Sequence, residues 1–106
     1  MFYKKNSYPH KKVIDGVKFI SLVHGEKTHL TEFRLEKGSK IPQHSHPQEQ
    51  TGYLVSGKLT FTIAGESIEA GPGDGWNIPG NVEHGVVVLD DALVIEVFSP
   101  PREDYL

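Results

Sequence analysis

The sequence predicts an all-β fold, a small antiparallel barrel or sandwich formed by one domain, and three observations support this. Segments rich in β-branched and aromatic residues recur along the 106-residue chain, separated at short intervals by Gly, Pro, Asn and Asp. No stretch before the tail shows the apolar period of a helix. A chain of this length buries only roughly 60–70% of the surface that its unfolded form exposes, so a closed sheet is an economical core.

The strands are expected in chain order at Val17–Val23, Thr28–Leu35, Thr51–Val55, Lys58–Ala64, Glu66–Ala70, Gly75–Ile78, Glu83–Leu89 and Ala92–Phe98. The breaks between them are expected at 36–39, 56–57, 64–65, 70–74, 79–81 and 90–91, where Gly, Pro, Asn, Asp or Ser residues occur. We divide the single domain into an N-terminal arm (1–16), a barrel (17–99) and a C-terminal tail (100–106). The arm is expected to be disordered or to pair with a neighbour, and the tail after Pro101 is the only helix candidate.

The composition excludes several classes of protein. A formal net charge of −3 provides no basic face for nucleic acid, although one Arg can still attract a small anion locally. Because there are no cysteines, a disulfide scaffold is impossible and a metal site must use His, carboxylate or amide ligands. No apolar stretch resembles a signal peptide or reaches transmembrane length, so we expect a cytoplasmic protein with no membrane partner.

His44 and His46 carry the strongest functional signal. Alternate side chains of an extended chain point to the same side, so both imidazoles can face one ion. Pro42 and Pro47 flank the pair and stiffen the backbone that orients it. Taken alone, a His-x-His is more often two exposed loop histidines. Here a third histidine, His84, follows a turn that contains proline and precedes an apolar run, which adds a second half-site.

Two motifs at these positions resemble those of the cupin superfamily. The first, Gly-x5-His-x-His-x3-Glu-x6-Gly, is matched by Gly38, His44, His46, Gln50 and Gly57. The second, Gly-x5-Pro-x-Gly-x2-His, is matched by Gly73, Pro79, Asn81 and His84. The resemblance covers residues 30–99 and implies a single-domain cupin, a double-stranded β-helix or jelly-roll barrel. Asn81 replaces a motif glycine, a mild change because Asn tolerates a left-handed turn.

The motif position that usually holds Glu is occupied by Gln50, beside Glu49. Motif spacing and the alternation from His46 favour Gln50 as the fourth ligand over Glu49, although Pro47 weakens the alternation. A neutral amide oxygen leaves the ion one charge more positive, and therefore a stronger Lewis acid held less tightly. The resemblance implies one divalent transition metal ion on His44, His46, Gln50 and His84. Ni, Zn, Fe, Mn and Cu all suit these donors.

The last predicted strand carries a carboxylate within an apolar run. Alternation places Ala92, Val94, Glu96 and Phe98 on one face and Leu93, Ile95 and Val97 on the other. Burial of a carboxylate is costly unless the group is paired or does chemistry. Glu96 therefore lies either in the barrel lumen, with a raised pKa suited to proton transfer, or on the outer face or in a subunit interface.

The ending Glu96-Val-Phe98-Ser-Pro-Pro-Arg102 looks like that of the pectin-degradation, KdgF-like cupins. Those proteins convert 4,5-unsaturated monouronates from pectin or alginate breakdown into linear ketonised sugars. The resemblance implies that Glu96 is the catalytic acid, beside Phe98 and Arg102, and that the partner is a small anionic sugar. The family acid is usually Asp, so this Glu is one methylene longer. Arg102 either binds the sugar carboxylate as a bidentate donor or pairs in solvent with Glu103 or Asp104.

Other residues and functions stay open at this point. Trp76 and Tyr53 could stack on a sugar ring, but packing in the core is the favoured use of each. Three further histidines match no ligand position and are interpreted as surface or structural residues: His10, His24 and His29. The alternatives to the uronate enzyme are a metal-dependent dioxygenase of the cupin type and a non-catalytic sugar- or metabolite-binding cupin. The apolar face of the last strand is compatible with a homodimer.

Overall fold

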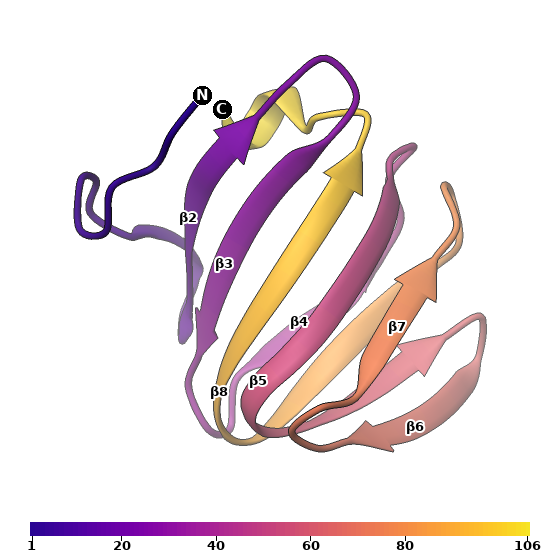
Figure 1. The fold of residues 1–106 in the computed structure, drawn as a ribbon. Helices are drawn as coiled ribbons and strands as arrows, with labels where there is room; N and C mark the ends of the chain where they lie inside the picture. Colours follow the sequence, from indigo (N-terminus) through magenta and orange to yellow (C-terminus); the bar gives the residue numbers. More distant parts are fainter.

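The structure is a computed structural model that describes residues 1–106, with eight β-strands and one short 3-10 helix (Figure 1). The strands are β1 (Lys11–Ile14), β2 (Val17–His24), β3 (His29–Leu35), β4 (Lys40–His44), β5 (Glu49–Ile63), β6 (Glu66–Ala70), β7 (Gly75–Ile78) and β8 (His84–Ser99). The helix η1 (Glu103–Tyr105) lies in the predicted tail. All strand pairs are antiparallel, and the all-β jelly-roll prediction is confirmed.

The barrel has two walls, which are two halves of one sheet, and the long strands β5 and β8 run through both. The first wall contains the second half of β8, and the second wall contains its first half. The second half of β8 pairs with β3 on one side and with the first half of β5 on the other. The first half of β8 pairs with β4 and with the second half of β5. Strands β1 and β2 extend the first wall beyond β3, β7 joins it at β5, and β6 extends the second wall beyond β5. The walls are therefore halves of one continuous sheet that folds over on itself.

Each long strand bends where the sequence predicts a break. The β5–β8 register shifts between Leu54 and Leu59, which corresponds to the expected break at 56–57, and opposite it Asp90 and Asp91 stay within β8. Gly57 is required at this bend, because its φ is +98° and an added Cβ would lie 2.3 Å from the carbonyl oxygen of Asp91. Four predicted strands are thus two bent ones, since a bulge can redirect a strand without ending it.

The sequence missed two strands, β1 and β4. Strand β1 lies in the predicted arm but pairs with β2 of the same chain. Strand β4 contains Pro42, which argues against a strand, yet it is short and pairs only with β8. Its last residue, His44, is the partner of His84 in the ladder. The missed strand therefore carries one of the candidate ligands.

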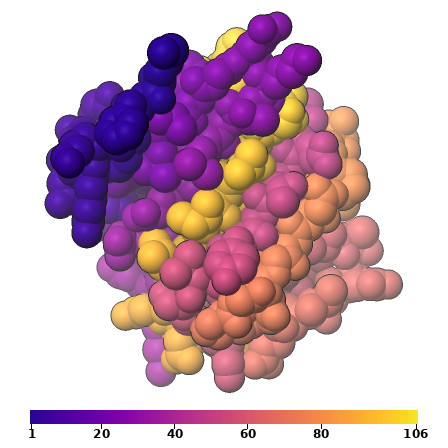
Figure 2. Space-filling view, viewed as in Figure 1, coloured from indigo at the N-terminus to yellow at the C-terminus, as the bar shows by residue number.

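The inner face of the folded sheet holds the apolar core. In the second half of β8 the buried residues are Ala92, Val94, Glu96 and Phe98, which confirms the predicted alternation. The outer faces of β3, β8, β5 and β7 lie side by side in the space-filling view (Figure 2). Tyr53 lies on this outer face of β5 and is 51% exposed, so the expectation that it packs in the core is wrong. None of the elements is a helix with the length and hydropathy that a membrane crossing requires.

Candidate metal centre

Three histidines from separate segments meet at one end of the barrel. His44 ends β4, His46 lies in the loop that follows it, and His84 begins β8. One ring nitrogen from each of the three lies within 4.8 Å of the others. The ring centroids of His44 and His84 are 4.3 Å apart, and those of His46 and His84 are 5.0 Å apart. The structure therefore gathers the three imidazoles that the two motifs predict.

Backbone carbonyls orient all three rings in the same way. The Nδ1 atoms of His44, His46 and His84 lie 2.9, 3.0 and 2.9 Å from the carbonyl oxygens of Pro42, Gln48 and Val82. A carbonyl oxygen only accepts, so each Nδ1 carries the proton and each Nε2 keeps its lone pair. A metal-binding histidine usually has its second nitrogen held in this manner, which sets both tautomer and ring direction. The three Nε2 atoms are ready to act as ligands.

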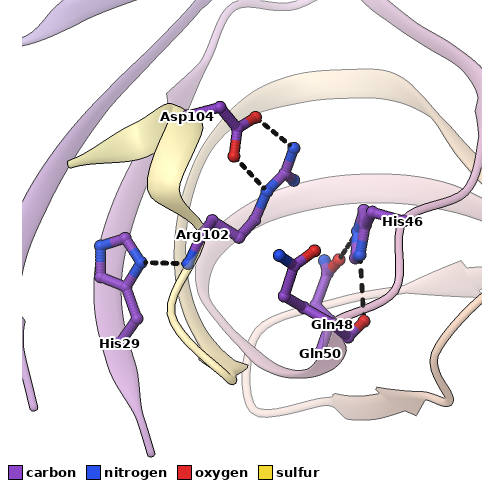
Figure 3. A network of polar contacts seen from close by, with 6 residues as sticks. All are labelled: His29, His46, Gln48, Gln50, Arg102 and Asp104. Atoms are coloured by element: carbon purple, nitrogen blue, oxygen red, sulfur yellow. Dashed lines mark hydrogen bonds and ion pairs between the residues drawn. The ribbon is translucent and has the colours of Figure 1, made fainter. Parts of the chain in front are cut away.

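Gln50, and not Glu49, joins this group. Gln50 is buried at the start of β5, and its Oε1 lies 3.1 Å from His46 Nε2 (Figure 3). Both atoms present lone pairs, an arrangement that a cation between them stabilises. Glu49 is exposed, and its carboxylate accepts a hydrogen bond from Asn77 instead. The chain bends at Pro47 and Gln48, so this bend, and not strand alternation, brings Gln50 to the histidines.

The donor set fits a divalent transition metal. His84 Nε2 is buried without a hydrogen-bond partner, a costly state for a polar atom that a metal–ligand bond would relieve. Burial is the largest influence on His84 and lowers its pKa to about 4. Burial also lowers the pKa of His46, and the positive charge of Arg102 adds to this effect. The unprotonated imidazoles that metal binding needs are therefore the favoured form at neutral pH.

A cavity lies next to the histidines, inside the barrel. The volume of this cavity is about 70 Å³. Most of its wall is apolar and includes Val13 and Ile14 of the missed strand β1. Its non-hydrophobic lining residues are His44, Gln50, His84, Glu96 and Arg102. The polar lining of the cavity thus consists of residues that the two resemblances single out.

Glu96 lies on the inner face of β8 and is 4% exposed. Trp76 Nε1 donates to its Oε1 at 2.9 Å, while its Oε2 has no hydrogen-bond partner. Burial raises the pKa of Glu96 to about 8, and the side chains of Gln50 and Trp76 oppose the shift. Of the two predicted positions for this carboxylate, the structure places it in the lumen. Trp76 also packs on Phe61, with ring centroids 4.5 Å apart, so it combines core packing with a polar contact to the candidate acid.

Arg102 pairs with Asp104 and also lines the cavity. Its Nε and Nη2 donate to the two carboxylate oxygens of Asp104, as the solvent-paired alternative requires (Figure 3). Its side chain is nevertheless only 13% exposed and lines the cavity. The guanidinium carbon lies 4.0 Å from the ring centroid of Tyr105 and 5.2 Å from that of Phe98. The tail therefore holds a cation against aromatic rings at the wall of the cavity.

His29 is the structural residue that links this tail to the barrel. It is fully buried on β3, and its Nδ1 accepts a hydrogen bond from the backbone N–H of Arg102 at 3.2 Å. Its Nε2 therefore carries the proton and donates to Ser21 Oγ at 2.6 Å. His24, by contrast, is exposed, and neither of them joins the metal cluster. Sequence reasoning missed the contact of Trp76 with Glu96, because only the folded sheet brings the two residues close, whereas the Arg102–Asp104 pair and a structural His29 were among its interpretations.

The folded-over antiparallel sheet with histidines at one end defines a cupin, and the chain belongs to this family. The model of the family described as "Cupin domain" matches residues 31–98. Within the family the chain is KdgF-like, as its sequence predicts. It is 27% identical to the pectin degradation protein KdgF of Dickeya dadantii (strain 3937) over 107 residues, which cover 99% of this chain and 97% of that protein.

Solved structures support the same placement. The structure of KdgF from Halomonas sp. matches with a TM-score of 0.94 and 30% identity, and the match covers 100% of this chain and 98% of that one. An RmlC-like cupin from Shewanella frigidimarina NCIMB 400 matches with a TM-score of 0.93 and 26% identity, over 99% of this chain and 95% of that one. The agreement extends over nearly the whole chain, including the arm and the tail.

Proposed function

We propose that this chain is a metal-dependent enzyme that opens and ketonises 4,5-unsaturated monouronates released from pectin or alginate. The observation that carries the proposal is the polar lining of the cavity: metal-ligand candidates, one acid and one guanidinium, and nothing else polar but the Tyr105 hydroxyl. The similarity to two KdgF proteins over nearly their full length supports it. These groups match the carboxylate, the hemiacetal and the enol ether of such a sugar.

The reaction is an isomerisation that needs no oxidant, no reductant and no nucleophile. The hemiacetal hydroxyl loses its proton, the bond between the anomeric carbon and the ring oxygen breaks, and an aldehyde forms. The ring oxygen remains on the former enol-ether carbon as an enolate. The proton taken from the hydroxyl then adds to the neighbouring alkene carbon, and the enolate becomes a ketone. The protein has to hold the carboxylate and to transfer one proton from oxygen to carbon.

Arg102 is assigned to the carboxylate. Its planar guanidinium suits bidentate recognition of a carboxylate, and only one edge of it is bonded to Asp104. The rings of Tyr105 and Phe98 and the Asp104 carboxylate restrict its position before substrate arrives. An anchor that is already oriented loses less entropy on binding than a free surface arginine.

Glu96 is assigned to the proton transfer. It is the only carboxyl group that lines the cavity, it is shielded from bulk water, and one of its oxygens has no partner within the protein. Phe98, two residues further on the same face of β8, is 1% exposed and closes the wall between Glu96 and the tail. A divalent ion bound by the three histidines and Gln50 would supply Lewis acidity toward a substrate oxygen.

The test is to incubate the metal-loaded protein with unsaturated galacturonate and to follow the loss of its conjugated absorbance. We expect an acceleration over buffer, and we expect Glu96→Gln and Arg102→Ala to slow it by roughly 10²-fold or more at normal metal content. Arg102→Ala should act mainly on KM, because it removes the anchor. Wild-type protein with no acceleration would end the proposal. Substrate-dependent oxygen uptake would indicate the dioxygenase, and binding without turnover would indicate the binding module.

A further inference from the structure

A hydrogen bond crosses a strand to reach Glu96. Trp76 lies on β7 and Glu96 on β8, and β5 runs between these two strands. The cross-strand partner of both residues is Gly52 of β5. The indole Nε1 donates to Glu96 Oε1 at 2.9 Å, so the contact spans the width of the intervening strand.

Gly52 makes this crossing possible. A Cβ at position 52 would lie 2.1 Å from Trp76 Nε1 and 2.6 Å from Glu96 Oε2. Real Cβ atoms do not approach other heavy atoms so closely, and the two groups that would have to move are the donor and the carboxylate themselves. The lack of a side chain, and not a left-handed backbone, is therefore what this glycine provides.

The two oxygens of Glu96 have different environments as a result. Oε1 is held by the indole, whereas Oε2 is buried without a partner. The backbone of Glu96 is also restricted, because Thr31 Oγ1 donates to its carbonyl oxygen at 2.9 Å. The carboxyl group is thus held by the indole at one oxygen, and the side chain of Gln50 also interacts with it.

We propose that Trp76 is a positioning residue for Glu96, and that it reaches the carboxyl group only because Gly52 leaves the space between them free. The indole restrains Oε1, so the carboxyl group meets the reacting sugar in a single orientation. This inference rests on the proposed function, in which Glu96 transfers the proton. Restraint of a proton-transfer group before substrate binds lowers the cost of reaching the reactive geometry.

Core packing is the competing explanation for Trp76, since its ring contacts Phe61. The two explanations differ in what they require of the indole N–H. Packing needs the ring and not the donor, so Trp76→Phe would leave the rate of the folded enzyme unchanged. Positioning needs the donor, so the same variant would slow the chemical step while the Arg102 anchor still binds substrate.

The first measurement is a comparison of steady-state kinetics on unsaturated galacturonate for the metal-loaded wild type, Trp76→Phe and Gly52→Ala. We expect kcat to fall at least about tenfold in both variants, a part of the roughly 10²–10⁴-fold effect of general acid–base catalysis, with KM within about twofold. Asn77→Ala is the matched control: it is the next residue of β7, and its side chain bonds to Glu49 and Thr51 on the exposed side. Its kcat should stay within about twofold of the wild type.

The second measurement needs no turnover, because Trp76 is the only tryptophan in the chain. The single indole N–H signal in a proton–nitrogen NMR spectrum therefore reports this contact directly. We expect it to move toward the position of a free indole in Gly52→Ala and in Glu96→Ala, and to stay in place in Asn77→Ala. If the chemical shift of the indole N–H is unchanged in both Gly52→Ala and Glu96→Ala, the hydrogen bond is absent and the inference is overturned.

The outcomes separate the inference from the proposed function. Slow Trp76→Phe and Gly52→Ala enzymes with a nearly unchanged KM, together with the shifted indole signal, support positioning. If the wild type is active and Trp76→Phe is equally active, the positioning role is overturned and the proposed function stays intact. A wild-type protein with no activity on the sugar overturns both.

Discussion

Gln50 contributes a neutral oxygen where a carboxylate would add a negative charge to three imidazoles. The amide is buried beside His46 Nε2, whereas the neighbouring carboxylate of Glu49 turns outward to Asn77. Gln50 therefore determines the net charge of the centre, and the bend before β5 determines where its side chain points. A more positive centre polarises a bound oxygen more strongly and retains its ion less tightly.

We predict that Gln50→Glu strengthens metal binding by about tenfold or more and lowers kcat, because the added charge stabilises the ion and reduces its Lewis acidity. The measurement is competition for Zn²⁺ against a chromogenic chelator at neutral pH. Glu49→Gln is the control and should leave the affinity unchanged. The opposite pattern, in which Glu49→Gln weakens binding and Gln50→Glu has no effect, would show that Glu49 is the ligand.

At the scale of elements, the C-terminal tail is held by the buried His29. The backbone N–H of Arg102 donates to His29 Nδ1, and Ser21 accepts from the opposite nitrogen. This arrangement requires the neutral imidazole, because a protonated Nδ1 cannot accept. Burial lowers the pKa of His29 from its usual value of 6.5, with His24 and Arg102 adding to the effect and Asp104 opposing it.

A lowered pKa makes the tail sensitive to acid. The unfolded chain binds a proton at His29 more readily than the folded one, so the free energy of unfolding falls as pH drops below about 6.5. We predict that His29→Asn, whose Oδ1 still accepts from the Arg102 N–H and does not titrate, loses less stability between pH 7.5 and 5.5 than the wild type. Urea unfolding of both proteins with a chelator present measures this difference. Equal losses would mean that His29 is not the acid-sensitive group of the tail.

At the scale of the whole molecule, the outer face of the first wall carries an apolar strip, beside polar residues of β3 such as Glu32 and Arg34. Tyr53 and Val55 of β5 are 51% and 43% exposed, and Leu93, Ile95 and Val97 of β8 are half-buried beside them. Tyr53 and Ile95 are cross-strand partners, so the exposed residues form one continuous strip. An apolar strip of this kind on a small domain is typical of an interface between proteins.

We therefore propose that two copies pair through this strip. Light scattering after size exclusion should give twice the 11.8 kDa mass of the chain. Tyr53→Glu should give a folded monomer, because an outward-facing charge has little effect within one chain but is costly at an apolar interface. Thr62→Glu, on a half-buried position on the outer face of the other wall, should remain dimeric. A monomeric wild type at roughly 100 μM, far above the Kd of a stable dimer, would overturn this proposal.

Local patterns in the sequence were sufficient for most strand segments, but not for β1 and β4, and they were sufficient for the donor types of the centre. Alternation along the last strand placed Glu96 and Phe98 on the same face, because side-chain direction in a strand has a period of two, and the structure decided that this face is the inner one. The spacing of His44, His46, Gln50 and His84 identified the cluster through its resemblance to cupin motifs. Composition excluded disulfides without any structure, because the chain has no cysteine.

Only the tertiary structure decided which residues share an environment. Whether Ser56–Gly57 ends a strand or bends it depends on β8 opposite, and the burial of Glu96 depends on Trp76 reaching across Gly52. His29 and Arg102 are 73 residues apart, and no local pattern links them. The physical reason is common to these cases: each contact requires strands to pair in one register over long separations, and that register is a property of the closed sheet as a whole.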